Sequence, residues 1–372
     1  MFERYINEYP DDPLSKPLFF RLAGVYAQSL ELETAIRYYE ALYARTNGRG
    51  EPYADAAGAL INAGLLKVGI GDYEGAATTF EKYERELAEE PDRESVYWRA
   101  AEQWERVSTA RAERFYREYL RKYPDQNPDH VMEALYRLAR IAEDGGRRRD
   151  IEQAWDNLAD GYARLAPTGT VGPLGRKYAA AAELRRVQAS LDAFMEVPDR
   201  LKNNAAKYAE LMGERRDELP RLEAQALDLI KNYSEFESTS AALYTLGKAY
   251  YAYADQLYSA PLPAEFRADP ELEMVYYEKL DELRIPLEDK GKGRLTAVLQ
   301  TAKDQGLWSV WQTRTLEELS KRAPAEFSPE KEQFPVQGES GAVPGAGALS
   351  LPTPEAGAQR DGEAGASQGG GE

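Results

Sequence analysis

The chain has 372 residues, of which 30% are charged and 43% hydrophobic, and its formal net charge is −17. So strong a negative charge opposes binding to nucleic acid or to an anionic membrane surface, and no apolar stretch is long enough to predict membrane insertion. Cysteine is absent, which excludes disulfides, thiolate metal sites and cysteine nucleophiles.

The first residues carry a pattern that returns later in the chain. Segment 2–11 (FERYINEYPD) has the same spacing of aromatic residues, and the same closing Pro-Asp, as segment 116–125 (YREYLRKYPD). Because the later segment ends the second helix of a helical hairpin, we interpret the earlier one in the same way. A second helix without its first would leave an apolar stripe uncovered, so we expect the chain to start mid-repeat, with residues upstream of Met1 missing.

Four helix pairs with a recurring residue pattern follow, and the clearest second helix begins at Gly71-Asp72-Tyr73 and continues to Phe80. Gly64 and Ala76 lie where this helix and the one before it should cross most closely, and Phe80 should fill the space one turn further on. The small positions of the four second helices are looser in spacing than an ideal period of about 34 residues. The fourth is occupied by a larger residue, which predicts a wider hairpin; these positions are Ala35, Ala76, Ala112 and Ile151.

This pattern resembles the tetratricopeptide repeat (TPR), which places large, small and aromatic residues on a first helix and Ala and an aromatic on a second. The resemblance implies an all-α fold, an α-α superhelix in which antiparallel helix hairpins stack into a solenoid. We assign residues 1–166 to these repeats.

The pattern changes after residue 166. Residues 167–175 (PTGTVGPLG) are rich in Pro and Gly and predict a loop between two helical blocks. Within 176–260 we expect long helices at 176–196 and 199–217 and one ending near residue 233. A further helix there starts with a TPR-like spacing at Leu243, Leu246-Gly247 and Tyr250.

The last part of the chain predicts a different helical module and a tail. Within 261–327 we expect three helices, near 270–284, 286–305 and 311–323, with Trp308 and Trp311 packing the last against its neighbour. Residues 328–372 are rich in Pro, Gly, Ala and Ser, with almost no aromatic residues. This composition is typical of a disordered tail.

A second resemblance concerns the end of the second helical block. Residues 253–263 (YADQLYSAPLP), Tyr276-Tyr277 with Leu280, and 286–289 (PLED) resemble a module of large TPR proteins of myxobacterial envelopes, some of which belong to the adventurous gliding-motility apparatus. The resemblance implies a periplasmic or cell-envelope assembly scaffold whose secretion signal would lie upstream of Met1. The alternative is a cytoplasmic TPR adaptor or co-chaperone.

The sequence offers little catalytic chemistry. It lacks the usual nucleophile-elbow, phosphate-loop and zinc-protease motifs. The sole histidine, His130, follows Asp129 at a helix start and has no carboxylate at a metal-binding spacing, so we expect a surface histidine. Arg147-Arg148-Arg149 predict a solvated loop. We therefore expect no enzyme, no cofactor and no metal.

The expected function is protein binding. In a TPR array the first helices line a concave groove that holds an extended or helical segment of a partner. Candidate groove residues are exposed neighbours of the packing positions. The basic and amide pattern with which chaperone-binding TPR clamps grip a terminal carboxylate is not evident. The candidates are Arg21, Asn62, Arg99, Gln103 and Arg137.

Overall fold

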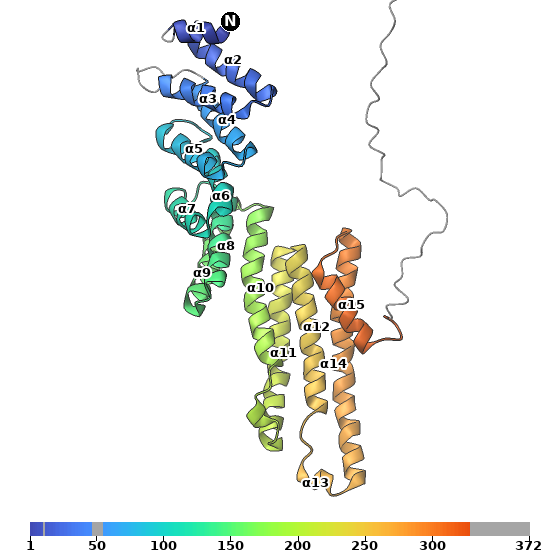
Figure 1. The fold of residues 1–372 in the computed structure, drawn as a ribbon. Helices are drawn as coiled ribbons and strands as arrows, with labels where there is room; N and C mark the ends of the chain where they lie inside the picture. Colours follow the sequence, from blue (N-terminus) through green and yellow to red (C-terminus); the bar gives the residue numbers. More distant parts are fainter. Residues whose placement is uncertain (10–11, 47–54, 328–372) are drawn as a thin grey trace, which may run out of the picture.

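The computed structural model describes residues 1–9, 12–46 and 55–327, and these residues are all-α, with 15 α-helices and no strand. Successive helices pack as antiparallel pairs into a superhelix, so the predicted fold class is confirmed (Figure 1). The predicted tail, 328–372, lies outside the described residues. No helix in the described ranges is long and apolar enough to cross a membrane.

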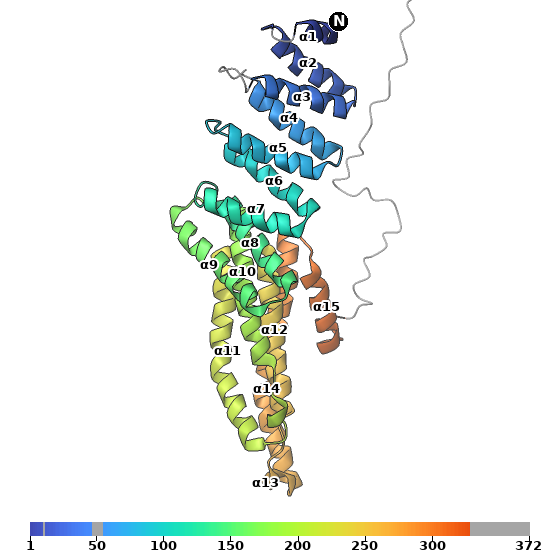
Figure 2. The ribbon, with the colours of Figure 1, turned by 60° about the vertical axis from the view of Figure 1, so that its left-hand side comes forward.

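The first nine helices form a stack in which each packs mainly against the helix before it and the helix after it (Figures 1 and 2). The four predicted helix pairs correspond to α2 with α3, α4 with α5, α6 with α7, and α8 with α9. The helices are α1 (Phe2–Glu8), α2 (Ser15–Gln28), α3 (Leu32–Thr46), α4 (Ala56–Gly69), α5 (Tyr73–Glu86), α6 (Arg93–Val107), α7 (Thr109–Lys122), α8 (Pro128–Gly145) and α9 (Arg148–Leu165).

Small residues set the closest approaches between these helices. A Cβ atom added to Gly64 would lie 2.5 Å from the ring of Phe80, and Ala76 is fully buried, as the sequence predicts. The fourth hairpin makes its close contact at Gly161, where an added Cβ would lie within 2.4 Å of Leu135. Ile151, at the position expected to be small, is only half-buried.

The remaining helices form a longer bundle below the stack (Figure 2). Its helices are α10 (Pro173–Met195), α11 (Ala205–Tyr233), α12 (Phe236–Tyr258), α13 (Ala264–Arg267), α14 (Pro270–Gln305) and α15 (Val310–Arg322), with short 3₁₀ turns at Ala166–Thr168 and Asp199–Leu201. The predicted loop 167–175 is therefore too long. Pro173 occupies the first turn of α10, where its fixed φ suits a helix and its missing N–H has no role.

Two predicted helix breaks at proline are wrong. The segment 199–217 from residue 205 onward and the helix ending near 233 form one helix, α11, with Pro220 inside it. The predicted helices 270–284 and 286–305 likewise form one helix, α14, with Pro286 inside it. Both prolines are exposed. The backbone carbonyl that each leaves without its helical partner can therefore bond to water, and packing on either side keeps the helix continuous.

Helix α12 is the centre of the bundle and packs against α10, α11, α14 and α15. It crosses α14 at two glycines: a Cβ on Gly247 would lie 3.1 Å from the carbonyl oxygen of Gly291. The predicted packing of the last helix is half right. Trp311 of α15 lies 5.5 Å from Tyr244 of α12, between ring centroids. Trp308 is 62% exposed, because it precedes α15 in the connection from α14.

Helix α10 joins the stack to the bundle. Tyr178 and Ala182 in its first half belong to the same hydrophobic core as α5 to α9. Val187, Leu191 and Phe194 in its second half belong to the core formed with α11 and α12. One helix therefore contributes to both cores and fixes the bundle against the end of the stack (Figure 1).

Candidate protein-binding surface

The five predicted groove residues are distributed over four helices and do not form one site. Arg21 on α2 is exposed and lines a shallow apolar pocket of about 370 Å³ beside Phe2 and Leu14. Asn62 on α4 is half-buried, and Arg99 on α6 is exposed.

Gln103 is not an exposed groove residue. It is 5% exposed, its Nε2 donates to the carbonyl of Arg99 at 3.5 Å, and its Oε1 has no hydrogen-bond partner in the described structure. It lies seven residues, or two helical turns, after the buried Val96, so the two share a face. Helix α6 packs on both α5 and α7, and the sequence pattern underestimates how much of its surface this buries.

Arg137 on α8 takes part in contacts between helices. It is half-buried and lies 3.1 Å from Glu133 and 3.5 Å from Glu105 of α6. Glu105 in turn accepts a hydrogen bond of 2.7 Å from the hydroxyl of Tyr116. Burial first, and this carboxylate second, raise the pKa of Tyr116. Arg137 therefore offsets the negative charge of the Glu105 carboxylate within the fold.

His130 was expected at the surface but is half-buried between α6 and α8. Its ring stacks on Trp98 with centroids 4.4 Å apart, and its Nδ1 lies 2.7 Å from Oε1 of Glu94. Glu94 also accepts a hydrogen bond from the hydroxyl of Tyr119. Burial raises the pKa of Glu94, but the hydrogen bonds from His130 and Tyr119 outweigh burial and leave that pKa below its ordinary value. The cluster connects three helices.

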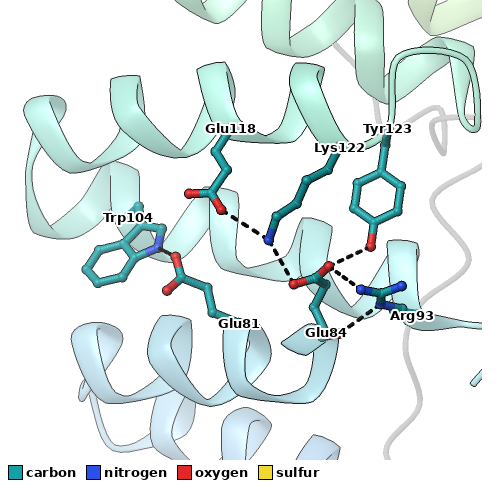
Figure 3. Close-up of polar contacts among 7 residues, drawn as sticks. All are labelled: Glu81, Glu84, Arg93, Trp104, Glu118, Lys122 and Tyr123. Carbon is teal, nitrogen blue, oxygen red and sulfur yellow. Dashed lines mark hydrogen bonds and ion pairs between the residues drawn. The ribbon is translucent and has the colours of Figure 1, made fainter. Parts of the chain in front are cut away.

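A second buried carboxylate lies between α5, α6 and α7 (Figure 3). Glu84 is 3% exposed and accepts from Arg93 Nη2 at 2.7 Å, Lys122 Nζ at 2.9 Å and the Tyr123 hydroxyl at 3.1 Å. Burial raises its pKa, but Lys122, Tyr123 and Arg93 together lower it below the ordinary value of 4.5. Lys122 also pairs with Glu118 at 3.1 Å. With three donors on its two oxygens, Glu84 stabilises the packing of these helices.

No group of three or more His, Asp or Glu residues is placed to hold a metal ion in the ranges that the structure describes.

A groove lies between α7 and α9, with α8 as its floor. Its volume is about 650 Å³. The floor is apolar and only half-buried, and the rims are mostly polar. The floor residues are Leu135, Leu138, Ile141 and Ala142; Thr109, Ala110, Glu113 and Arg117 line the α7 rim, and Asp144, Gly145, Arg147, Asp150, Gln153, Ala154 and Asn157 line the other.

None of the five predicted groove residues lines this groove. Leu135, Leu138, Ala139 and Ala142 occupy the packing positions of a TPR first helix on α8, but only Ala139 is fully buried. Of the three arginines expected in a solvated loop, Arg148 and Arg149 instead begin α9, and only Arg147 precedes the helix. Arg147 is exposed, lines the groove and pairs with Asp150 at 2.9 Å. The sequence signal that could have located the groove is the apolar face of α8, which we interpreted as part of the core.

No protein-family model matches the chain. A search of the curated proteins also finds no significant match.

Proposed function

We propose that the chain is a non-enzymatic protein-binding scaffold, a TPR-type solenoid that holds a segment of a partner protein in the groove between α7 and α9. The observation that carries this proposal is the half-buried apolar floor of the groove between its polar rims. An apolar centre with a polar edge is the usual anatomy of a site that buries a partner segment.

The geometry of the floor suits a segment rather than a small molecule. Leu135, Leu138 and Ala142 follow each other at helical spacing, so they form a row along α8 that extends for about two turns. An amphipathic helix or an extended strand of a partner could place successive apolar side chains along such a row. Covering it would remove apolar surface from water, which stabilises a complex by about 25 cal/mol per Å² before the costs of association.

The test is a selection of random peptides of about 15 residues, long enough for four helical turns, against the full chain. Ala110→Trp fills the exposed α7 rim of the groove, whereas Ala224→Trp makes the same change at an exposed position of α11. We expect the selected peptides to compete with one another, to lose affinity for the first variant and to keep it for the second. Peptides that bind both variants as tightly as the parent chain would refute the groove as the site.

We further propose that the scaffold works in a bacterial cell envelope, as the resembling TPR proteins of gliding motility do. The support is the motif resemblance of residues 253–289, which here form the far end of the bundle, from the end of α12 through α13 to the first half of α14. Protease added to spheroplasts of the cells that make the protein should digest it if it is periplasmic. Protection from that protease would instead favour the cytoplasmic adaptor or co-chaperone.

A further inference from the structure

Helix α7 is a strongly basic element in an acidic chain. The whole chain has a net charge of −17, and α7 forms one rim of the groove. Five basic residues on α7 stand against two acidic ones, so a local positive field lies beside the groove. The basic residues are Arg111, Arg114, Arg117, Arg121 and Lys122, and the acidic ones are Glu113 and Glu118.

Three of these arginines form a ridge on the solvent side of α7. Arg114, Arg117 and Arg121 are spaced three and four residues apart, so they share one helix face, and all three are exposed. The opposite face of α7 is buried against its neighbours through Ala112, Phe115, Tyr116 and Tyr119. Arg117 also lines the groove, so the ridge borders the groove directly.

The charge on this ridge is poorly neutralised within the protein. Arg114 and Arg121 form no ion pair with any residue that the structure describes. Arg117 pairs with Glu113 at 2.7 Å, but the two side chains are 69% and 39% exposed, and such exposed pairs contribute little and exchange readily. Two guanidinium groups, and a third held weakly, are therefore available to carboxylates of a partner.

We infer that the partner segment is an acidic amphipathic stretch, with aliphatic side chains on the α8 floor and Asp or Glu side chains facing Arg114, Arg117 and Arg121. This inference rests on the proposed function and specifies its partner. The opposite rim carries Asp144, Asp150 and Arg147, and Arg147 pairs with Asp150 at 2.9 Å. That rim therefore offers no surplus positive charge to carboxylates of the partner, so the arginine ridge is the favoured side for them.

The ridge lies at the edge of the groove and stays in contact with water, so its charges act chiefly on the rate of association and on its salt dependence. The Debye length is about 10 Å at 0.1 M salt and about 3 Å at 1 M. Binding of an acidic segment should therefore weaken as salt is added, whereas contacts with the apolar floor persist.

The probes are two fluorescein-labelled peptides of about 15 residues with leucines at the same helical spacing, one with Glu and one with Lys at the remaining charged positions. Fluorescence anisotropy of each is followed with the full chain. We expect the Glu peptide to bind and the Lys peptide to bind at least roughly tenfold more weakly, with the difference shrinking at high salt.

Charge reversal on the ridge tests the contact itself. Arg114→Glu with Arg121→Glu removes no ion pair of the folded chain, so the variant should fold normally. Its control is Lys207→Glu with Arg221→Glu on α11, where both residues are also exposed and unpaired among the described residues. We expect the ridge variant to lose roughly tenfold in affinity for the Glu peptide and the control to keep it.

The outcomes separate this inference from the proposed function. Suppose that both peptides bind equally, that Ala110→Trp abolishes this binding and that charge reversal on the ridge leaves it unchanged. The groove would then remain the binding site, but the inference that the partner segment is acidic would be overturned. Binding of the Glu peptide that survives Ala110→Trp would overturn the groove as well. Two further results would also overturn the inference. If the peptide bound only after residues 328–372 were removed, the groove would be assigned to this chain's own C-terminal segment. If dimerisation of the chain displaced the peptide, the groove would be assigned to a second copy.

Discussion

Hydrogen bonds from tyrosine hydroxyls to carboxylates are the recurring side-chain contact of this molecule. The chain has 25 tyrosines and 10 phenylalanines. A thin two-layer stack has few positions far from water, and tyrosine can bury its ring there while its hydroxyl finds an acceptor. The acceptors are acidic side chains of neighbouring helices; the pairs are Tyr43 with Glu86, Tyr83 with Asp92, Tyr116 with Glu105, Tyr119 with Glu94, and Tyr250 with Glu223.

The Glu84 cluster predicts a large loss of stability from one substitution. Glu84→Ala leaves Arg93 and Lys122 without their buried partner, so the free energy of unfolding should fall by about 2–3 kcal/mol. The loss stays below the upper range for buried ion pairs because both bases keep some contact with water. Urea denaturation of the full chain measures this. Glu152→Ala, which removes an exposed partner of Arg148, should cost less than about 0.5 kcal/mol. Equal effects of the two substitutions would contradict the role of Glu84.

The same carboxylates predict how stability depends on pH. The pKa values of Glu84, Glu94 and Glu223 lie below the ordinary value of 4.5, since hydrogen bonds and bases outweigh the opposing effect of burial. Their contribution is therefore complete above pH 4.5, the unfolded value, and is lost as the pH falls through the lower folded values. Urea midpoints should stay level from pH 7 to pH 5 and drop below it. Glu84→Gln should start lower and fall less steeply; an unchanged slope would contradict the assignment.

At the scale of elements, close helix crossings depend on missing side chains. Gly247 of α12 and Gly291 of α14 meet backbone to backbone, and a Cβ on Gly291 would also lie 3.0 Å from the ring of Tyr251. Two helices held this closely at one point must separate if either glycine gains a side chain.

Two glycines of α14 form a matched pair for testing this crossing. Gly291→Ala should destabilise the protein by about 1–3 kcal/mol, because the added Cβ meets backbone that cannot move alone. Gly293→Ala, two residues later on the same helix, meets nothing within 4 Å and should stabilise it by about 0.5–1 kcal/mol through better helix propensity. Thermal unfolding followed by circular dichroism distinguishes the signs. If both variants shifted the unfolding temperature in the same direction, the proposed role of the close helix crossing would be contradicted.

The sequence predicts the hairpins of the stack well because their signals are local. Gly64, Ala76 and Phe80 occupy fixed steps of a helix pair, and their contacts follow from that spacing. Pro220 and Pro286 misled the prediction because the cost of a proline inside a helix depends on whether the orphaned carbonyl reaches water and on packing from distant segments. The residues next to each proline in the sequence reveal neither the access of that carbonyl to water nor the packing from distant segments.

The candidate site was harder to predict because it depends on the distance between helices that are not consecutive. Leu135 and Leu138 look like core residues in sequence, and they line a groove only because α7 and α9 leave one face of α8 partly open. Gln103 shows the reverse error, since a polar residue is buried when both neighbouring helices cover its face. Burial in a stack is set by the curvature of the whole array.

At the scale of the whole molecule, the two halves have different contact patterns. A helix of the stack meets mainly its two neighbours in the chain, whereas α12 of the bundle packs against four other helices. Stability in such a stack is close to a sum of local terms, and an end helix has only one neighbour to supply them. Stability should therefore rise along the chain from α1 toward the bundle.

Hydrogen exchange followed by mass spectrometry on the full chain tests this gradient. Amides of α1 and α2 should exchange fastest among the helices, because α1 packs mainly on α2, and amides of α10 and α12 should exchange slowest. Peptides from α5 and α7, with two neighbours each, should fall between them. Protection of α1 equal to that of α12 would contradict a local account of stability.

The position of α10 in two cores has a consequence for the order in which the protein is made. On the ribosome, α8 and α9 emerge before α10, so Tyr178 and Ala182 can dock as soon as they leave the exit tunnel. Val187, Leu191 and Phe194 gain their full set of partners only after residues 242–257 have been translated, because α12 contributes to their core together with α11. During that interval part of the apolar face of α10 is exposed to solvent. This segment of the nascent chain is therefore a site to which a cotranslational chaperone can bind.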